Sequence, residues 1–278
     1  MPAINRGTSH SVGSWLSPCT HPPTVCPTCP TCPTNRDTFN TTTNRMNYLA
    51  HGCRFLDSPY FVAGTAVPDW LSVIDRKVRV RGHAAETLLA DEDFATRQLA
   101  AGILRHLADD RWFHQTRAFA ETSLRFAVEL RQRLPDDEGF RPSFLGHILV
   151  EILIDATLME RDPGLAADYY QTLGGVSTTH VQDVVNRIAR IPSNHRVPTN
   201  HLAVGIARFL EVRFLYDYLD DARLLFRLEQ IMRRVGLPPL GEHLLSWLPA
   251  ARAVVAQRCD ELLTPPAATP VADPSPPT

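Results

Sequence analysis

Apolar residues recur every three or four positions through most of the chain, the spacing that predicts amphipathic helices. The segment Phe94–Gln115, for example, places Leu99, Ile103 and Leu107 on one helix face. Capping residues, proline and glycine bound further segments of this kind, over Phe119–Leu134, Pro142–Glu160, Leu165–Thr172, Ser177–Arg190, Thr199–Tyr218, Asp220–Val235 and Gly241–Leu263. Alternation typical of a strand occurs only over Lys77–Arg81, so we predict an all-α multi-helix bundle.

Composition divides the chain into three parts. Residues 1–45 are rich in Thr, Pro, Ser and Cys, and residues 264–278 form a Pro/Ala tail. Segments with so few core-building residues cannot bury enough apolar surface to fold alone, so we predict that both are disordered. Residues 46–263 have the pattern of a single helical domain. Met46, where that pattern begins, is a candidate start of translation.

The cysteines do not predict a disulfide framework. Four of them lie in the N-terminal segment, at Cys19, Cys26, Cys29 and Cys32. Proline follows three of these four and favours an extended chain, and no second pair of ligands follows at zinc-finger spacing. We therefore interpret this run as low-complexity sequence. Cys53 and Cys259 are isolated thiols, which is typical of proteins in a reducing compartment.

Charge and hydropathy limit the classes of partner. The formal net charge is −2 at pH 7, so the chain lacks the basic excess that attracts nucleic acids or anionic membranes. The apolar stretch Ile148–Met159 is interrupted by Glu151 and Asp155, whereas a transmembrane helix needs ~20 apolar residues. The N-terminus lacks the apolar core of a secretory signal. We expect a cytoplasmic protein with no transmembrane segment and no nucleic-acid partner.

A row of ionisable residues lies on the helix predicted over Pro142–Glu160. From position 144 to 159 all residues are apolar, glycine or threonine except His147, Glu151 and Asp155. Residues four apart share one helix face, and a helix that is apolar nearly all round belongs in the core. Burying carboxylates without partners costs several kcal/mol each. This row therefore requires a metal ion or cationic side chains opposite it.

The helix predicted over Phe94–Gln115 carries a matching row. It consists of His106, Asp110 and His114. Two antiparallel core helices with such rows can meet and build a metal site, as helix bundles do. Imidazole and carboxylate ligands favour zinc, with manganese or iron as alternatives, over calcium. The competing interpretation is a buried hydrogen-bond network between the histidines and carboxylates of the two rows.

Three further residues are candidates for the same site. Asp69 follows Pro68, whose fixed φ can hold the carboxylate at a turn or a helix start; a simple helix cap is the alternative. His51 follows the apolar run Tyr48–Ala50, and His83 lies in a polar stretch. A lone histidine is more often a core or surface residue than a metal ligand, so these two positions need additional support.

The chain order of these residues provides that support. The order is His51, Pro68-Asp69, His83, His106-x-x-x-Asp110, His114 and His147-x-x-x-Glu151. It resembles the zinc-dependent phospholipase C family and the related single-strand nucleases of fungi and plants. The resemblance implies an all-helical enzyme that binds a cluster of zinc ions through these His, Asp and Glu side chains. It also implies that Asp69 is a bridging carboxylate and the general base.

The first half of the helical domain carries a second resemblance. Met46-Asn-Tyr-Leu-Ala-His51, Leu56-Asp-Ser58, Gly64 and Asp69 are followed by Gly102-Ile-Leu-Arg-His106 and Asp110. This set is similar to the acyl-carrier-protein phosphodiesterases, which hydrolyse a phosphopantetheine ester with a divalent metal. The chain departs from that family at Leu107, where arginine is usual, and at His147 and Glu151, where we would expect acidic residues.

Both resemblances imply a phosphoester substrate. Clustered divalent ions lower the pKa of a bound water toward ~7 and stabilise charge on phosphoryl oxygens, and Asp69 or Asp110 can orient that water. We predict a metal-dependent phosphoester hydrolase acting on a small-molecule, phosphopantetheinyl or lipid substrate. One alternative is a non-catalytic binding or scaffold protein with a structural or vestigial metal site. Another is an iron or manganese oxidoreductase, which needs Glu-x-x-His pairs where this chain has His-x-x-x-acid.

Overall fold

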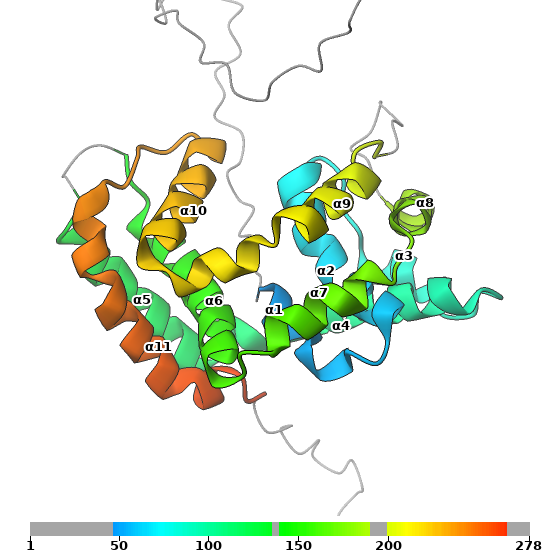
Figure 1. Ribbon diagram of the computed structural model, residues 1–278, viewed down its shortest axis with the longest axis horizontal. Coiled ribbons are helices and arrows are strands. Elements are labelled where there is room, and N and C mark those ends of the chain that lie inside the picture. The colour runs from blue at the N-terminus through cyan, green and yellow to red at the C-terminus, as the bar shows by residue number, and fades with distance from the viewer. Residues whose placement is uncertain (1–46, 135–138, 190–198, 266–278) are drawn as a thin grey trace, which may run out of the picture. The chain divides into compact units, whose positions relative to one another are not determined.

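Helices and turns make up the parts of the chain that the computed structural model describes, residues 47–134, 139–189 and 199–265 (Figure 1). These ranges contain no strand, so the all-α prediction is confirmed. They all belong to one compact unit, Thr43–Thr278. The predicted disorder of residues 1–45, the candidate start and the cysteine run lie outside the described residues, as do residues 266–278 of the predicted tail.

Most predicted helices form close to their predicted ends. The structure contains α4 (Phe94–Phe113), α5 (Arg117–Arg131), α6 (Pro142–Arg161), α7 (Leu165–Gly174), α8 (Thr178–Ile188) and α10 (Asp221–Arg234). Two predicted caps also form: the Ser177 side chain accepts from the His180 N–H, and the Asp220 side chain accepts from the Arg223 N–H. Each side chain satisfies an N–H group that a helix start leaves without an intrahelical partner.

Two predicted helices are divided in the structure. Their segments are α9 (Leu202–Val212) and the 3-10 helix η2 (Phe214–Leu219), and then the 3-10 helix η3 (Glu242–Ser246) and α11 (Leu248–Leu262). The first division falls at Arg213, which has a left-handed conformation with φ 50° and so ends α9. The second division precedes Pro249, which stands in the first turn of α11, where proline is tolerated.

The sequence pattern did not predict the helices before Phe94. They are α1 (Tyr48–Gly52), the 3-10 helix η1 (Cys53–Phe55), α2 (Pro59–Ile74) and α3 (Gly82–Glu86). Pro68 and Asp69 lie inside α2, so the prediction of a turn or helix start at this point is wrong. Proline removes one backbone hydrogen bond from a helix. Here the whole stretch Val62–Leu71 is buried, and tertiary packing keeps the helix continuous.

Helices α2 and α4 cross in direct backbone contact. A Cβ on Gly64 would lie 2.2 Å from the Leu99 carbonyl oxygen, and a Cβ on Gly102 would lie 2.0 Å from the Phe61 carbonyl oxygen. Only glycine fits at both positions. Helix α4 thus packs along α2, and α6 packs along α5, so α4 and α6 do not meet in the middle as expected but only where the C-terminal end of α4 approaches α6. Apolar periodicity identifies a buried face, but it does not identify the helix that covers it.

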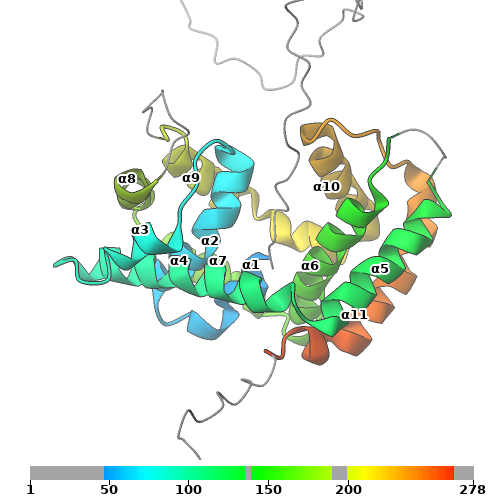
Figure 2. The same cartoon turned by 180° about the vertical axis from the view of Figure 1, so that it is seen from behind.

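Helix α1 lies among the helices that carry the ionisable rows. It contacts α2, α4, α6 and α7, and both views show α5, α6 and α11 on one side of it and α2 and α3 on the other (Figures 1 and 2). The Asp155 carboxylate of α6 accepts hydrogen bonds from the Leu49 N–H (3.1 Å) and the Ala50 N–H (2.9 Å). These are N–H groups of the first turn of α1, so Asp155 fixes the start of α1 on α6.

Helix α6 passes the length and hydropathy criteria for a membrane span, and it does so alone among the described helices. Of its most apolar window, 67% is buried inside the fold. Burial of this kind is usual for a core helix.

We predict that Gly102→Ala lowers the free energy of unfolding by about 1–3 kcal/mol, the usual range for overpacking, because its methyl group would meet the Phe61 carbonyl. Chemical denaturation of the purified variant measures this change. The matched control is Gly174→Ala in α7, where an added Cβ meets nothing within 4 Å. Equal stability of the two variants would contradict the backbone contact.

Candidate metal centre

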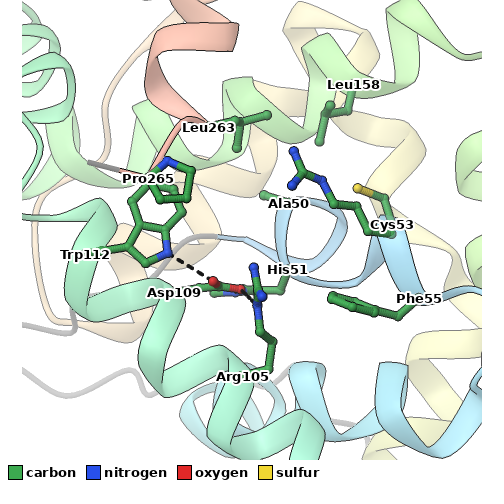
Figure 3. Close-up of a pocket in the computed structure, with 11 residues that line it drawn as sticks. Ala50, His51, Cys53, Phe55, Arg105, Asp109, Trp112, Leu158, Leu263 and Pro265 are labelled. Carbon is green, nitrogen blue, oxygen red and sulfur yellow. Dashed lines mark hydrogen bonds and ion pairs between the residues drawn. The ribbon is translucent and has the colours of Figure 1, made fainter. Parts of the chain in front are cut away.

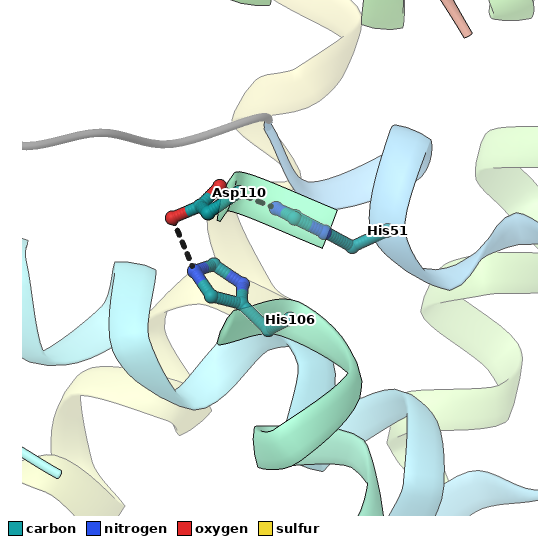
Figure 4. Close-up of side chains that lie close together, drawn as sticks. All are labelled: His51, His106 and Asp110. Carbon is teal, nitrogen blue, oxygen red and sulfur yellow. Dashed lines mark ion pairs between the residues drawn. The ribbon is translucent and has the colours of Figure 1, made fainter. Parts of the chain in front are cut away.

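Three buried side chains from α1 and α4 converge in the core. They are His51, His106 and Asp110, whose potential ligand atoms all lie within 4.8 Å of one another. Asp110 Oδ1 is 3.4 Å from His51 Nε2, and Asp110 Oδ2 is 3.3 Å from His106 Nε2. Figure 4 shows the carboxylate joined to both rings, which stack with their centroids 4.0 Å apart. We call these three residues the inner group.

The α2–α4 crossing fixes the His106 ring. His106 Nδ1 donates a hydrogen bond of 2.7 Å to the Thr65 carbonyl oxygen. A carbonyl oxygen only accepts, so Nδ1 carries a proton and the Nε2 atom faces Asp110. Metal-binding histidines usually have this arrangement, with the second nitrogen bonded to a carbonyl or carboxylate. Thr65 follows Gly64, and His106 lies one turn after Gly102.

His51 is held from its other side by Asp109. His51 Nδ1 lies 3.5 Å from Asp109 Oδ2, and Arg105 Nε (2.8 Å) and Trp112 Nε1 (3.0 Å) donate to the same carboxylate. Figure 3 shows these side chains around a small pocket of about 70 Å³ that Cys53 also lines. Asp109 thus faces Nδ1 of His51, and Asp110 of the inner group faces Nε2. In a carboxylate–histidine–metal chain, a carboxylate likewise faces one ring nitrogen and the metal side lies at the other.

A second set of ligands lies where the C-terminal end of α4 approaches α6. It consists of His114, His147 and Glu151, which we call the outer group. Glu151 Oε1 is 3.1 Å from His114 Nε2 and 3.0 Å from His147 Nε2, and the two rings stack at 9°. His114 Nδ1 donates to the Asp110 carbonyl oxygen at 2.7 Å. The second group therefore repeats the hydrogen-bonding arrangement of His106 and adjoins the first.

The geometry of the ring nitrogens favours a metal site over a hydrogen-bond network. Both nitrogens of His51 and the Nε2 atoms of His106 and His147 are buried and make no hydrogen bond of normal geometry within the described ranges, although a carboxylate oxygen lies 3.0–3.5 Å from each of them. The 3.3 and 3.4 Å separations in the inner group exceed the ~2.7–2.9 Å of charge-assisted hydrogen bonds. They match the ~3.3 Å between two ligands of a tetrahedral ion with bonds of ~2.0–2.1 Å. Both groups can therefore hold a metal ion.

The carboxylates change the protonation of the histidines. Burial alone would lower the pKa of His51, but the Asp109 and Asp110 carboxylates raise it to about 10. Burial also opposes the shift at His114, whose pKa is raised by Glu151. Conversely, His106 and His51 hold the pKa of Asp110 below its usual value despite the burial of this carboxyl. Without a metal ion, His51 is a cation at neutral pH.

The remaining predicted ligands lie in three different environments. Asp69 is 6% exposed on α2, close enough to His51 for its charge to contribute to the raised pKa of that ring. Asp155 belongs to neither group, because its oxygens accept from the backbone of α1; its burial raises the pKa of this carboxyl to about 7. His83 is exposed on α3 and also belongs to neither group.

Sequence reasoning missed two supports of the site. The role of Asp109 had a signal, because an acidic residue directly before Asp110 falls on a neighbouring part of the α4 surface. The role of the Thr65 carbonyl had none, because a backbone oxygen leaves no mark in the residue pattern. It became visible only through the close approach of α2 and α4.

A groove reaches the outer group at Glu151. Its volume is about 660 Å³, and Asp69 and Glu151 line it together with apolar residues of α2, α6, α9 and α10. Three protein ligands and an accessible fourth position are typical of a catalytic rather than a structural zinc site. Comparison of the chain with protein-family models, curated proteins and solved structures gave no match.

We predict that metal binding releases protons from the metal-free protein at pH 7. The Asp109 and Asp110 carboxylates raise the pKa of His51 to about 10 despite its burial, so a metal ion must displace a proton from this ring, and the apparent affinity should rise with pH. Calorimetric titration with zinc in two buffers of different ionisation enthalpy measures this release. His83→Gln, outside both groups, should release as many protons as the wild type. Heats independent of the buffer would contradict the prediction.

Proposed function

We propose that the chain is a metal-dependent phosphoester hydrolase, with zinc favoured and manganese or iron as alternatives. The observation that carries this proposal is the outer group, His114, His147 and Glu151, with three convergent ligands and a groove beside Glu151. The two resemblances noted in the sequence favour the same class of reaction. The two free cysteines among the described residues, Cys53 and Cys259, suit the reducing cytoplasm.

The residues divide the chemical work between them. The outer group and the inner group would hold the ions, which supply a water of lowered pKa and stabilise charge on the phosphoryl oxygens. Asp69 lies on the groove wall, where its carboxylate orients the attacking water and takes its proton. Asp109 and the Thr65 carbonyl keep the His51 and His106 rings in position. The buried start of α1, fixed by Asp155, excludes water behind the site.

One observation favours a second candidate, a binding or scaffold protein with a structural metal. The inner group is buried, with side chains of His51 and His106 that are 0% and 1% exposed. An ion there would join α1 to α4 and stabilise the fold without contacting a substrate. The two candidates differ in what the Asp69 carboxylate does, because a structural ion does not need a base on the groove wall.

We predict that the metal-loaded protein hydrolyses bis(p-nitrophenyl) phosphate and that Asp69→Asn lowers kcat at least ~10²-fold, the usual contribution of a general base. The variant should keep its metal content, because Asp69 belongs to neither ligand group. Release of p-nitrophenol and elemental analysis of the same sample measure both quantities. His83→Asn is the matched control and should leave the rate unchanged.

The same assay separates the two groups of ligands. His147→Ala should remove metal from the outer group, lower thermal stability and abolish hydrolysis, while the inner group keeps its ion. If the metal-loaded wild type hydrolyses no phosphodiester or phosphomonoester, the hydrolase proposal is contradicted and the binding or scaffold protein with a structural metal is favoured. Full activity of Asp69→Asn would remove the assigned base.

A further inference from the structure

The groove beside the outer group is lined by four arginines, and only two of them are neutralised. Arg208 forms an ion pair with Glu211 at 2.6 Å, and Arg227 forms one with Asp217 at 2.6 Å. Arg227 also lies over the rings of two phenylalanines on the same wall. These two side chains are therefore held in place by the protein itself.

The other two arginines, Arg76 and Arg234, have no ion-pair partner within residues 47–134, 139–189 and 199–265. Arg76 follows the C-terminal end of α2, and Arg234 is the last residue of α10, so they come from different helices. Both line the groove. Partial desolvation lowers the pKa of the Arg234 guanidinium, and the nearby positive charge of Arg76 lowers it further. Two cations that repel one another in one groove are a ready site for an anion.

Charge is distributed unevenly along the groove. Its acidic lining residues in the described chain are Asp69 and Glu151, which adjoin or belong to the metal ligands. Asp69 lies five positions before Ile74, the last residue of α2, which at 1.5 Å per residue is about 7.5 Å along the helix axis, and Arg76 follows two positions later. The groove is also lined by apolar side chains, among them Trp70, Val73 and Ile148. A ligand that fills the groove therefore meets a candidate metal ligand, apolar side chains and cations.

We propose that the groove selects an amphiphilic phosphoester with two anionic ends: the phosphoryl group lies at the metal ligands, an apolar chain lies along the wall, and a distal carboxylate or phosphate pairs with Arg76 and Arg234. The inference rests on the proposed function for the phosphoryl end only. Arg76 and Arg234 are specificity-determining residues, because they contact a part of the substrate that does not react.

Two non-hydrolysable probes test the distal contact. Decylphosphonate carries one anionic end, and its ω-carboxy analogue of equal chain length carries two. The metal-loaded full-length protein should bind the ω-carboxy probe about tenfold more tightly by calorimetry, a preference worth 1.4 kcal/mol. The double variant Arg76→Gln/Arg234→Gln should lose the preference and bind both probes with the affinity that the wild type has for decylphosphonate.

A matched control separates the direct contact of Arg76 and Arg234 with the probe from the effect of the protein's overall charge. Lys77→Gln/Arg233→Gln removes the same charge at the two neighbouring positions, which are exposed and do not line the groove. This control should keep the tenfold preference. Equal affinity of the wild type for both probes, or a preference that survives in Arg76→Gln/Arg234→Gln, would overturn the inference.

Removal of the metal distinguishes the inference from the proposed function. Chelation should lower the affinity of the protein for both probes by the same factor, because both probes carry the phosphonate end. Affinities that chelation leaves unchanged would contradict the metal-dependent reaction while the arginine preference still stands. If the metal-loaded wild type binds both probes equally and chelation still weakens that binding, the result would contradict the arginine contact alone.

Discussion

The backbone contact between Gly64 and Gly102 is the constraint on which the site depends. It brings α2 and α4 closer than any residue with a Cβ would allow. At this separation the Thr65 carbonyl reaches His106 Nδ1 and fixes the tautomer of that ring. The remaining polar residues of α4 then follow at helical spacing toward α6. A modest shift of either helix would leave the His106 ring without its orienting partner.

Compensation of buried carboxylates explains why α1 is part of the same construction. Asp155 is fully buried, and two N–H groups at the start of α1 offset part of its cost of desolvation. That contact places His51 beside Asp110, whose own burial is offset by His51 and His106. Each buried charge in this part of the core thus orients the partner of the next. Metal ions in the two groups would complete the compensation that the unsatisfied ring nitrogens lack.

The sequence pattern predicted the helices that are uniformly apolar or clearly capped, and the candidate ligands of both rows lie on α4 and α6 or directly at the end of α4. Residues four apart on α4 and α6 fell into the inner and outer groups, because spacing along one helix is local information. It failed for α2, since Pro68 in the middle argues against a helix and only burial overrides it. The pattern also assigned Asp155 to the metal site, because it shares a helix face with Glu151. In the structure the backbone of α1 packs on this part of α6 and donates hydrogen bonds to Asp155. Partners across helices depend on packing, which periodicity does not encode.

The metal content of the full-length protein, purified without a histidine tag, tests the central claim most directly. Elemental mass spectrometry should find a divalent ion, zinc ahead of manganese or iron, at up to one equivalent for each ligand group, and chelation should remove it. A protein without bound metal, even after each ion has been added back, would contradict the account. The two groups would then be a strained network of imidazoles and carboxylates, and the hydrolase proposal would have no chemical basis.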